Sequence, residues 1–277
     1  MISTIISKVT RILHLDTHKI LFDVFERNSG RILDEKIKHL NRPVKKLLEE
    51  EDERQHYGDI ELTESGSQNV IRGFTIDRIR FIHDNIRISE NDTLVDLGDS
   101  NGIFIRSMNR DGISVNISDP ALKAIHAKQI EVIKADIEHL PFKAGSIDHI
   151  LLFETLEHVP NPIALLNEIG RVCRKSLVLS IPFVSTTTIH RHNYDPIKPL
   201  HQHHIFEFSP PDFKKILTHT RFTLQKEAEA VVLNDGNTLR EKMIFFFWRM
   251  FMEKDMYCGC FKKFYMCILS KEEDGMP

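Results

Sequence analysis

The chain has 277 residues, 41% of them hydrophobic, and a formal net charge of −3 at neutral pH. This length is enough for one domain of about 200 residues with an N-terminal appendage. Because acids and bases are interspersed, the sequence lacks the basic footprint of a nucleic-acid-binding protein. Four unevenly placed cysteines do not make a disulfide framework, and with no convincing secretory signal we expect a cytoplasmic protein.

The first fifteen residues carry a stripe of apolar side chains at helical spacing. Its members are Ile2, Ile5, Ile6, Val9, Ile12 and Leu13. We prefer the interpretation that this helix packs on the main domain, and contact with a membrane surface is the alternative. Helical spacing returns up to Leu48, and the polar stretch from Gly58 to Gly66 predicts a linker. We therefore expect a helical extension over residues 1–66 and a main domain over residues 67–272.

Strand and helix patterns alternate from Thr93 onward. Short apolar runs predict strands at 93–97, 113–117 and 131–135, then one ending at Phe153 and one at 176–181. Three dipeptides place a capping side chain before a proline: Asp119-Pro120, Asn161-Pro162 and Ser209-Pro210. This alternation is typical of an α/β fold, in which helices cover both faces of a parallel sheet.

The stretch from Asp92 to Phe104 runs from a buried strand through a polar loop into a helix. Gly98 and Gly102 allow unusual backbone angles in that loop, and apolar spacing resumes at Ile103. Backbone N–H groups at the start of the helix would suit a ligand with carboxylate, hydroxyl or phosphate oxygens. The loop lacks the three-glycine spacing of a dinucleotide site, so it defines no function alone.

Further motifs follow in order: Leu140-Pro-Phe142, then Phe153-Glu-Thr-Leu-Glu-His158, then Glu168-Ile-Gly-Arg-Val172. Over about residues 90–220 the chain resembles the class I S-adenosylmethionine-dependent methyltransferases, most closely the type 11 subgroup. The resemblance implies a Rossmann-like sheet of seven strands, mostly parallel, with an antiparallel last strand near 264–269. It also implies S-adenosylmethionine as cofactor and transfer of its methyl group to oxygen, nitrogen or carbon of a small-molecule acceptor. Sugar and lipid-linked acceptors both remain open.

The resemblance assigns the cofactor site to residues near the strand tips. They are Asp96, Gly98, Asp99, Ser100, Gly102, Asn116, Ile117, Asp136, Ile137 and Phe153. It places Asp96 and the glycine loop against the amino-acid head, Asp136 and Ile137 at the adenine, and Phe153 near the sulfonium.

Two positions depart from the family pattern. Ser100 stands where many members have glycine, and Asn116 stands where an acid usually binds both ribose hydroxyls. An amide accepts one such bond and donates another, but without the strength that charge adds. These departures motivate an alternative function, a binding or scaffold protein with the methyltransferase fold and weak or absent catalysis.

Histidines are dense after the fifth predicted strand, with five between positions 190 and 204. We predict that His190, His192 or His204 acts as a general base on the acceptor. Two alternatives stay open: these histidines are structural loop residues, or they bind a divalent metal with Asp195. Our predicted site contains no metal.

Overall fold

The structure of the protein is a computed structural model that describes residues 29–50, 65–182, 205–206, 208–231, 238–243 and 263–271. The strands are β1 (Leu94–Leu97), β2 (Ile113–Asn116), β3 (Glu131–Lys134), β4 (Ile147–Phe153), β5 (Cys173–Pro182), β6 (Phe222–Val231) and β7 (Lys263–Lys271). The helices include α3 (Arg42–Glu50), α4 (Ser65–Asn85), α5 (Ile103–Ser107), α6 (Asp119–His126), α7 (Pro162–Val172) and α8 (Pro210–Leu217), with a 3-10 turn, η2 (Leu156–His158). Residues 29–38 and 239–243 are helical as well.

The seven strands form one sheet in the order β3-β2-β1-β4-β5-β7-β6. The first five strands are parallel to one another, whereas β7 pairs antiparallel with both β5 and β6. The predicted seven-stranded, mostly parallel sheet with an antiparallel last strand is therefore confirmed.

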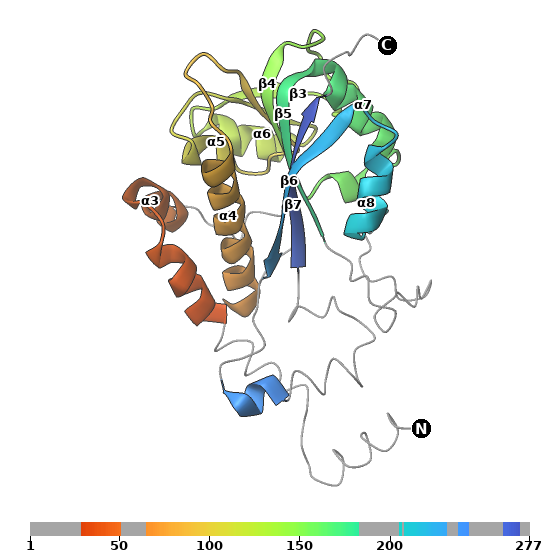
Figure 1. Cartoon of the computed structure of the whole chain (residues 1–277). Coiled ribbons are helices and arrows are strands. Elements are labelled where there is room, and N and C mark those ends of the chain that lie inside the picture. Colours follow the sequence, from red (N-terminus) through yellow and green to blue (C-terminus); the bar gives the residue numbers. More distant parts are fainter. Residues whose placement is uncertain are drawn as a thin grey trace.

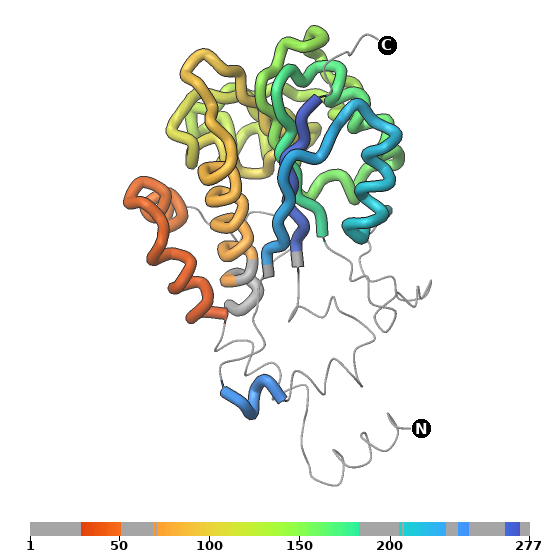
Figure 2. The backbone as a smooth tube through the Cα atoms, viewed as in Figure 1, coloured from red at the N-terminus to blue at the C-terminus, as the bar shows by residue number. Residues whose placement is uncertain are grey.

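Helices cover both faces of this sheet, with α3 and α4 on one side and α7 and α8 on the other (Figures 1 and 2). Side chains of β4 alternate between the two layers, as the twofold repeat of a strand requires. Leu151 and Phe153 pack with α3, α4 and α5, whereas Ile150 and Leu152 pack with α7 and α8. Both faces of the central strands are thus buried.

The described residues of the predicted N-terminal extension pack on α4. Val44, Leu47 and Leu48 of α3 are buried in the same hydrophobic cluster as the apolar side chains of α4. Lys36 adds an ion pair to Asp77 of α4. The stripe over the first fifteen residues and most of the predicted linker lie outside the described residues. In the described ranges, no helix is long and apolar enough to cross a membrane.

Two of the three predicted helix caps are confirmed and one is wrong. Asn161 Oδ1 accepts a hydrogen bond from Ala164 N at 3.0 Å, and Ser209 Oγ accepts one from Asp212 N at 3.2 Å. The cap of α6 is Ser118, not Asp119, since the serine has extended backbone angles and faces Ala121 N. The Asp119 carboxylate instead pairs with Lys134 Nζ at 2.8 Å. A proline is tolerated anywhere in the first turn, so its position does not determine which preceding residue is the cap.

Candidate active site

The loops that follow β1, β2, β3 and β4 leave the sheet at one edge, because these strands are parallel. The strand order reverses between β1 and β4. In open α/β sheets, ligands bind outside the carboxyl ends of the strands at such a switch point. The predicted glycine loop, residues 98–102, lies at this point.

The backbone of the loop requires glycine at two positions. Gly98 and Gly102 have φ angles of 76° and 75°, in the left-handed region. A Cβ on Gly98 would lie 2.6 Å from Thr155 Oγ1, and one on Gly102 would collide with the side chain of Ile130. Gly98 N donates to Val115 O at 2.8 Å and thereby ties the loop to β2.

The buried Asp99 carboxylate stabilises the loop from inside. Its Oδ1 accepts hydrogen bonds from Asn101 N at 3.0 Å and from Gly102 N at 2.7 Å. Asn116 Nδ2 donates to the carbonyl oxygen of Asp99 at 2.6 Å, and Asn116 Oδ1 accepts from Ser118 N at 2.9 Å. The amide of Asn116 therefore joins the tip of β2 to the glycine loop. A carboxylate at this position could not donate the bond to Asp99 O.

Asp96, at the end of β1, has the least satisfied carboxyl group of the glycine-loop region. Only 1% of the residue is exposed, and Oδ2 has no hydrogen-bond partner in the described part of the chain. Burial and then the charge of Asp99 raise the pKa of Asp96 well above its ordinary value, although Arg78 opposes the shift. Leaving such a group unsatisfied costs about 1–3 kcal/mol, which calls for an explanation by function.

Arg78 of α4 reaches the same edge of the sheet, and sequence reasoning missed it. Its Nη2 lies 3.1 Å from Glu154 Oε1, and its Nε donates to Ser180 Oγ at 3.0 Å. The guanidinium carbon lies 5.1–5.7 Å from the ring centroids of Phe74, Phe153 and Phe264. An arginine four residues from both Phe74 and Ile82, and so on the same helix face as these apolar side chains, was the available signal.

Glu154 directly follows β4 and is held in an unusual conformation. Its φ of 47° is in the left-handed region, and Glu154 N donates to Ser180 O at 3.1 Å. Ser180 Oγ also donates to Glu154 Oε1 at 2.9 Å. Backbone angles of this kind in a residue other than glycine are costly and concentrate at functional sites.

A second buried carboxyl group, that of Glu157 in η2, lies near Glu154 and Arg78. The residue is 1% exposed, and neither carboxyl oxygen has a hydrogen-bond partner in the ranges described. Among the described residues, the side chain of His158 pairs with it, with Nε2 3.9 Å from Oε1. Burial and the neighbouring Glu154 raise the pKa of Glu157 well above its ordinary value.

The residues predicted to bind adenine lie at neighbouring strand tips and are accessible. Ile117, just after β2, is 68% exposed, and the side chain of Asp136, just after β3, is 53% exposed. Asp136 Oδ1 accepts a hydrogen bond from Glu138 N at 3.0 Å, and Ile137 is half-buried. Phe153 is buried, with its ring centroid 4.5 Å from that of Phe104.

The predicted catalytic residues His190, His192 and His204, and the alternative metal ligand Asp195, lie outside the described residues. Their roles stay predictions. Among the residues that are described, no group of three or more histidine, cysteine or acidic side chains could hold a metal ion.

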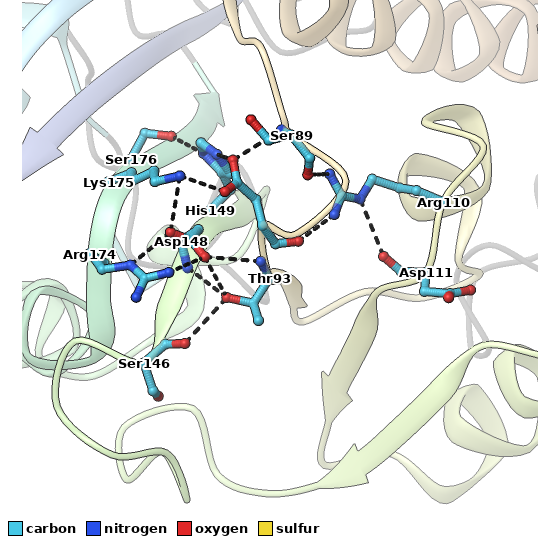
Figure 3. A network of polar contacts seen from close by, with 11 residues as sticks. Ser89, Thr93, Arg110, Asp111, Ser146, Asp148, His149, Arg174, Lys175 and Ser176 are labelled. Atoms are coloured by element: carbon cyan, nitrogen blue, oxygen red, sulfur yellow. Dashed lines mark hydrogen bonds and ion pairs between the residues drawn. The ribbon is translucent and has the colours of Figure 1, made fainter.

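The opposite edge of the sheet carries a polar network of a different kind, shown in Figure 3. Asp148 of β4 accepts hydrogen bonds from Arg174 Nε at 2.8 Å, Arg174 Nη2 at 2.6 Å and Thr93 N at 3.1 Å. Despite its burial, these bonds lower the pKa of Asp148 to about 2. His149 contacts Ser176 Oγ at 2.8 Å and Asp92 Oδ2 at 3.1 Å, and burial lowers its pKa.

The two edges therefore differ in how completely their charges are paired. At the amino ends of the strands the half-buried Asp92 and the buried Asp148 accept hydrogen bonds from several donors, which is typical of a structural network. At the carboxyl ends Asp96 and Glu157 keep oxygens without partners in the described chain. Topology and polarity thus make the carboxyl edge the candidate site, on a sheet with the strand order β3-β2-β1-β4-β5-β7-β6.

Comparisons with known proteins point to the methyltransferases. Residues 95–180 match the protein-family model described as "Methyltransferase domain". An uncharacterized chloroplastic methyltransferase of Arabidopsis thaliana is 26% identical over 184 residues, which cover 61% of this chain and 48% of that protein. A "Probable S-adenosylmethionine-dependent methyltransferase" of Mycobacterium tuberculosis is 26% identical over 100 residues, which cover 35% of this chain and 36% of that relative. The alignments thus span less than half the length of either relative.

A solved structure shows the same fold. Geranyl diphosphate C-methyltransferase from Streptomyces coelicolor matches with a TM-score of 0.55 at 13% identity, over 77% of this chain and 86% of that one. The methyltransferase-domain match over residues 95–180 and the shared fold agree with the resemblance that the motifs predicted.

Proposed function

We propose that this protein transfers a methyl group from S-adenosylmethionine to a small-molecule acceptor. The observation that carries the proposal is the buried Asp96 carboxyl group beneath the glycine loop, with Oδ2 lacking a partner in the described residues. An unsatisfied buried acid at the switch point of the sheet suits a cationic ligand.

The charge of the site fits this cofactor. Asp96, Asp99, Glu154 and Glu157 are acids at the carboxyl edge, and Arg78 is a cation near three of them. S-adenosylmethionine carries an ammonium and a sulfonium, and when bound it supplies an activated methyl group for in-line displacement. Asp96 and the loop from Gly98 to Gly102, with Asp99 and Ser100, would hold the amino-acid head.

The neighbouring strand tips would hold the nucleoside. Asn116 keeps a second amide hydrogen and a second lone pair for the ribose hydroxyls, beyond the bonds it makes to the protein. The exposed Ile117 and half-buried Ile137 offer apolar cover to a flat ring, and Asp136 offers an acceptor to its amino group. Phe153 would border the sulfonium.

The acceptor would approach from the side of η2, where apolar residues are exposed. Ile205 and Phe206 are 56% and 36% exposed, and their N–H groups donate to Glu157 O at 2.9 and 3.1 Å. This rim supports an acceptor with an apolar part. Catalysis then consists mainly of aligning the acceptor atom with the methyl group and excluding water. We keep His190, His192 and His204 as the proposed general bases.

Isothermal titration calorimetry tests the cofactor assignment. S-adenosylmethionine and S-adenosylhomocysteine should both bind the wild type, and Asp136→Ala should weaken binding by about 1.5–3 kcal/mol, the value of a hydrogen bond to a charged group. Asp84→Ala, which removes an exposed carboxylate from α4, is the matched control. Unchanged affinity in Asp136→Ala would show that the adenine assignment is wrong.

The same titration separates the proposal from its alternative. A wild-type protein that binds neither compound at millimolar concentration would be a scaffold with this fold. If the cofactor binds, formation of S-adenosylhomocysteine should be measured against a panel of small hydroxyl, amine and carbon acceptors. Turnover only with a macromolecule would refute the acceptor class.

A further inference from the structure

The side chain of Asn116, at the tip of β2, is held in one orientation by two bonds to the protein. Nδ2 donates to Asp99 O at 2.6 Å, and Oδ1 accepts from Ser118 N at 2.9 Å. A flipped amide would set acceptor against acceptor at Asp99 and donor against donor at Ser118, so neither bond would survive. The surroundings therefore define the direction of the amide.

This orientation determines how the tip of β2 can meet a ribose. Beyond its bonds to the described chain, the amide keeps one hydrogen on Nδ2 and one lone pair on Oδ1. One ribose hydroxyl would thus accept a hydrogen bond and the other would donate one. Both bonds would join neutral groups, so each is weaker than the bond that a carboxylate makes to a hydroxyl.

The charged groups beside Asn116 form an ion pair. Lys134 is the β3 residue in register with Asn116, and its Nζ lies 2.8 Å from Asp119 Oδ1. This contact lowers the pKa of Asp119, so both partners are charged at neutral pH. Residues in register on neighbouring strands share one face of the sheet, so the lysine and the amide lie on the same face. The acid at the tip of β3, Asp136, is assigned to the adenine instead.

The side chains around the amide are accessible. Ile117 is 68% exposed, and the side chains of Lys134 and Asp119 are 55% and 63% exposed. Asn116 itself is half-buried. A substituent on the ribose would therefore meet solvent and mobile polar groups instead of the packed core.

The combination of an amide and a nearby lysine differs from an acidic ribose site in what it excludes. An acid at the tip of β2 binds free hydroxyls and repels an anion at the same place. In dinucleotide-binding sheets, a phosphate on the ribose is accommodated where a cation stands nearby. Asn116 offers a donor and Lys134 a cation, and the exposed Asp119 can turn away into solvent.

We propose that Asn116 makes a neutral ribose subsite, which binds adenosines with a phosphate on the 2′ or 3′ oxygen nearly as well as adenosines with free hydroxyls. This specificity depends on the proposed function, since a nucleoside must occupy the tips of β2 and β3. Most of the affinity for the cofactor then comes from its adenine and its amino-acid head.

Displacement of S-adenosylhomocysteine from the full chain, followed by calorimetry, measures the contribution of each hydroxyl. The probes are adenosine, 2′-deoxyadenosine and 3′-deoxyadenosine. Each missing hydroxyl should weaken binding to the wild type by about twofold to tenfold, the range for a neutral hydrogen bond. A loss of about thirtyfold or more for either probe indicates a charge-assisted bond and would overturn the neutral subsite.

Adenosine 2′-monophosphate and adenosine 3′-monophosphate test the tolerance of charge. At least one should bind the wild type within about threefold of adenosine. In Asn116→Asp the ratio of the dissociation constants of that monophosphate and adenosine should rise at least about fivefold, because the new carboxylate repels phosphate. Effects on the glycine loop cancel in this ratio. Asn109→Asp, an exposed change on the turn after α5, should leave the ratio unchanged.

Two further outcomes would overturn the ribose subsite while S-adenosylhomocysteine still binds. They are exclusion of both monophosphates by the wild type, and an unchanged ratio in a folded Asn116→Asp variant. Far-ultraviolet circular dichroism checks that the variant is folded, and the wild-type measurements decide the matter if it is not. Failure of S-adenosylhomocysteine to bind the wild type would instead overturn the proposed function, and the ribose subsite with it.

Discussion

Replacing Asp96 by asparagine should make the protein more stable and a weaker binder of its cofactor. Asp96 is 1% exposed and its Oδ2 has no partner in the described residues. Asparagine keeps the shape of the side chain but removes the cost of burying a charge. Because asparagine is uncharged, it avoids the cost of burying or protonating this carboxylate at pH 7, which should add about 1–3 kcal/mol to the free energy of unfolding. At about 2–4 °C per kcal/mol for a domain of this size, the melting temperature should rise correspondingly.

Asp148→Asn is the matched control, because it makes the same change at the same depth in the neighbouring strand. Asp148 is 0% exposed, but Arg174 and Thr93 satisfy its carboxylate. Losing a hydrogen bond between charged groups should cost about 1.5–3 kcal/mol. The two asparagine variants are therefore expected to shift stability in opposite directions.

Urea denaturation followed by far-ultraviolet circular dichroism measures both shifts, and calorimetry measures cofactor affinity. The pKa of Asp96 is raised in the folded state, so the folded protein binds this proton more tightly than the unfolded chain. Wild-type stability therefore falls as pH rises above the ordinary aspartate value, and the advantage of Asp96→Asn should grow over the same range. If Asp96→Asn is destabilised like Asp148→Asn, or binds cofactor with undiminished affinity, the carboxyl group is structural.

Three further predictions concern single positions. Burial lowers the pKa of His149, so as the pH falls the imidazole is protonated in the unfolded chain before it is protonated in the folded protein. The free energy of unfolding should therefore decrease as the pH drops below about 6.5. In urea titrations at several pH values, His149→Gln should abolish this part of the pH dependence. Gly98→Ala should cost more stability than Gly145→Ala, because both have positive φ but only the first meets a neighbouring side chain; equal losses would mean that backbone strain alone matters. Asn116→Asp should lower the free energy of unfolding by about 1 kcal/mol, since the donor to Asp99 O is lost, and a stability gain would contradict this role of the amide.

Several features of the site were predictable because their signals are local. A strand needs a short apolar run, and a left-handed turn needs glycine, so β1 and the loop from Gly98 to Gly102 are evident in the sequence. The same holds for the caps Asn161 and Ser209, which act within three residues of their own position. The order of these motifs was enough to indicate the fold and its class.

The partners of individual polar groups were not predictable in this way. Arg78 is 76 residues from Glu154 and 102 residues from Ser180, and only the packing of α4 on the sheet brings them together. For Asn116 the sequence suggested a weakened ribose ligand, whereas the structure shows its amide bonded to the loop.

The sequence by itself determined the order of strands and helices, the glycine loop and the family, because propensity, capping and turn geometry depend on neighbours along the chain. Only the tertiary structure decided which buried acids are paired and which are not. Asp96 and Asp148 are similar in sequence, each an aspartate in an apolar strand. Within the described ranges Asp96 Oδ2 meets no donor, whereas Asp148 accepts hydrogen bonds from Arg174. Desolvation and pairing are properties of the assembled surroundings, so they arise only when distant segments pack together.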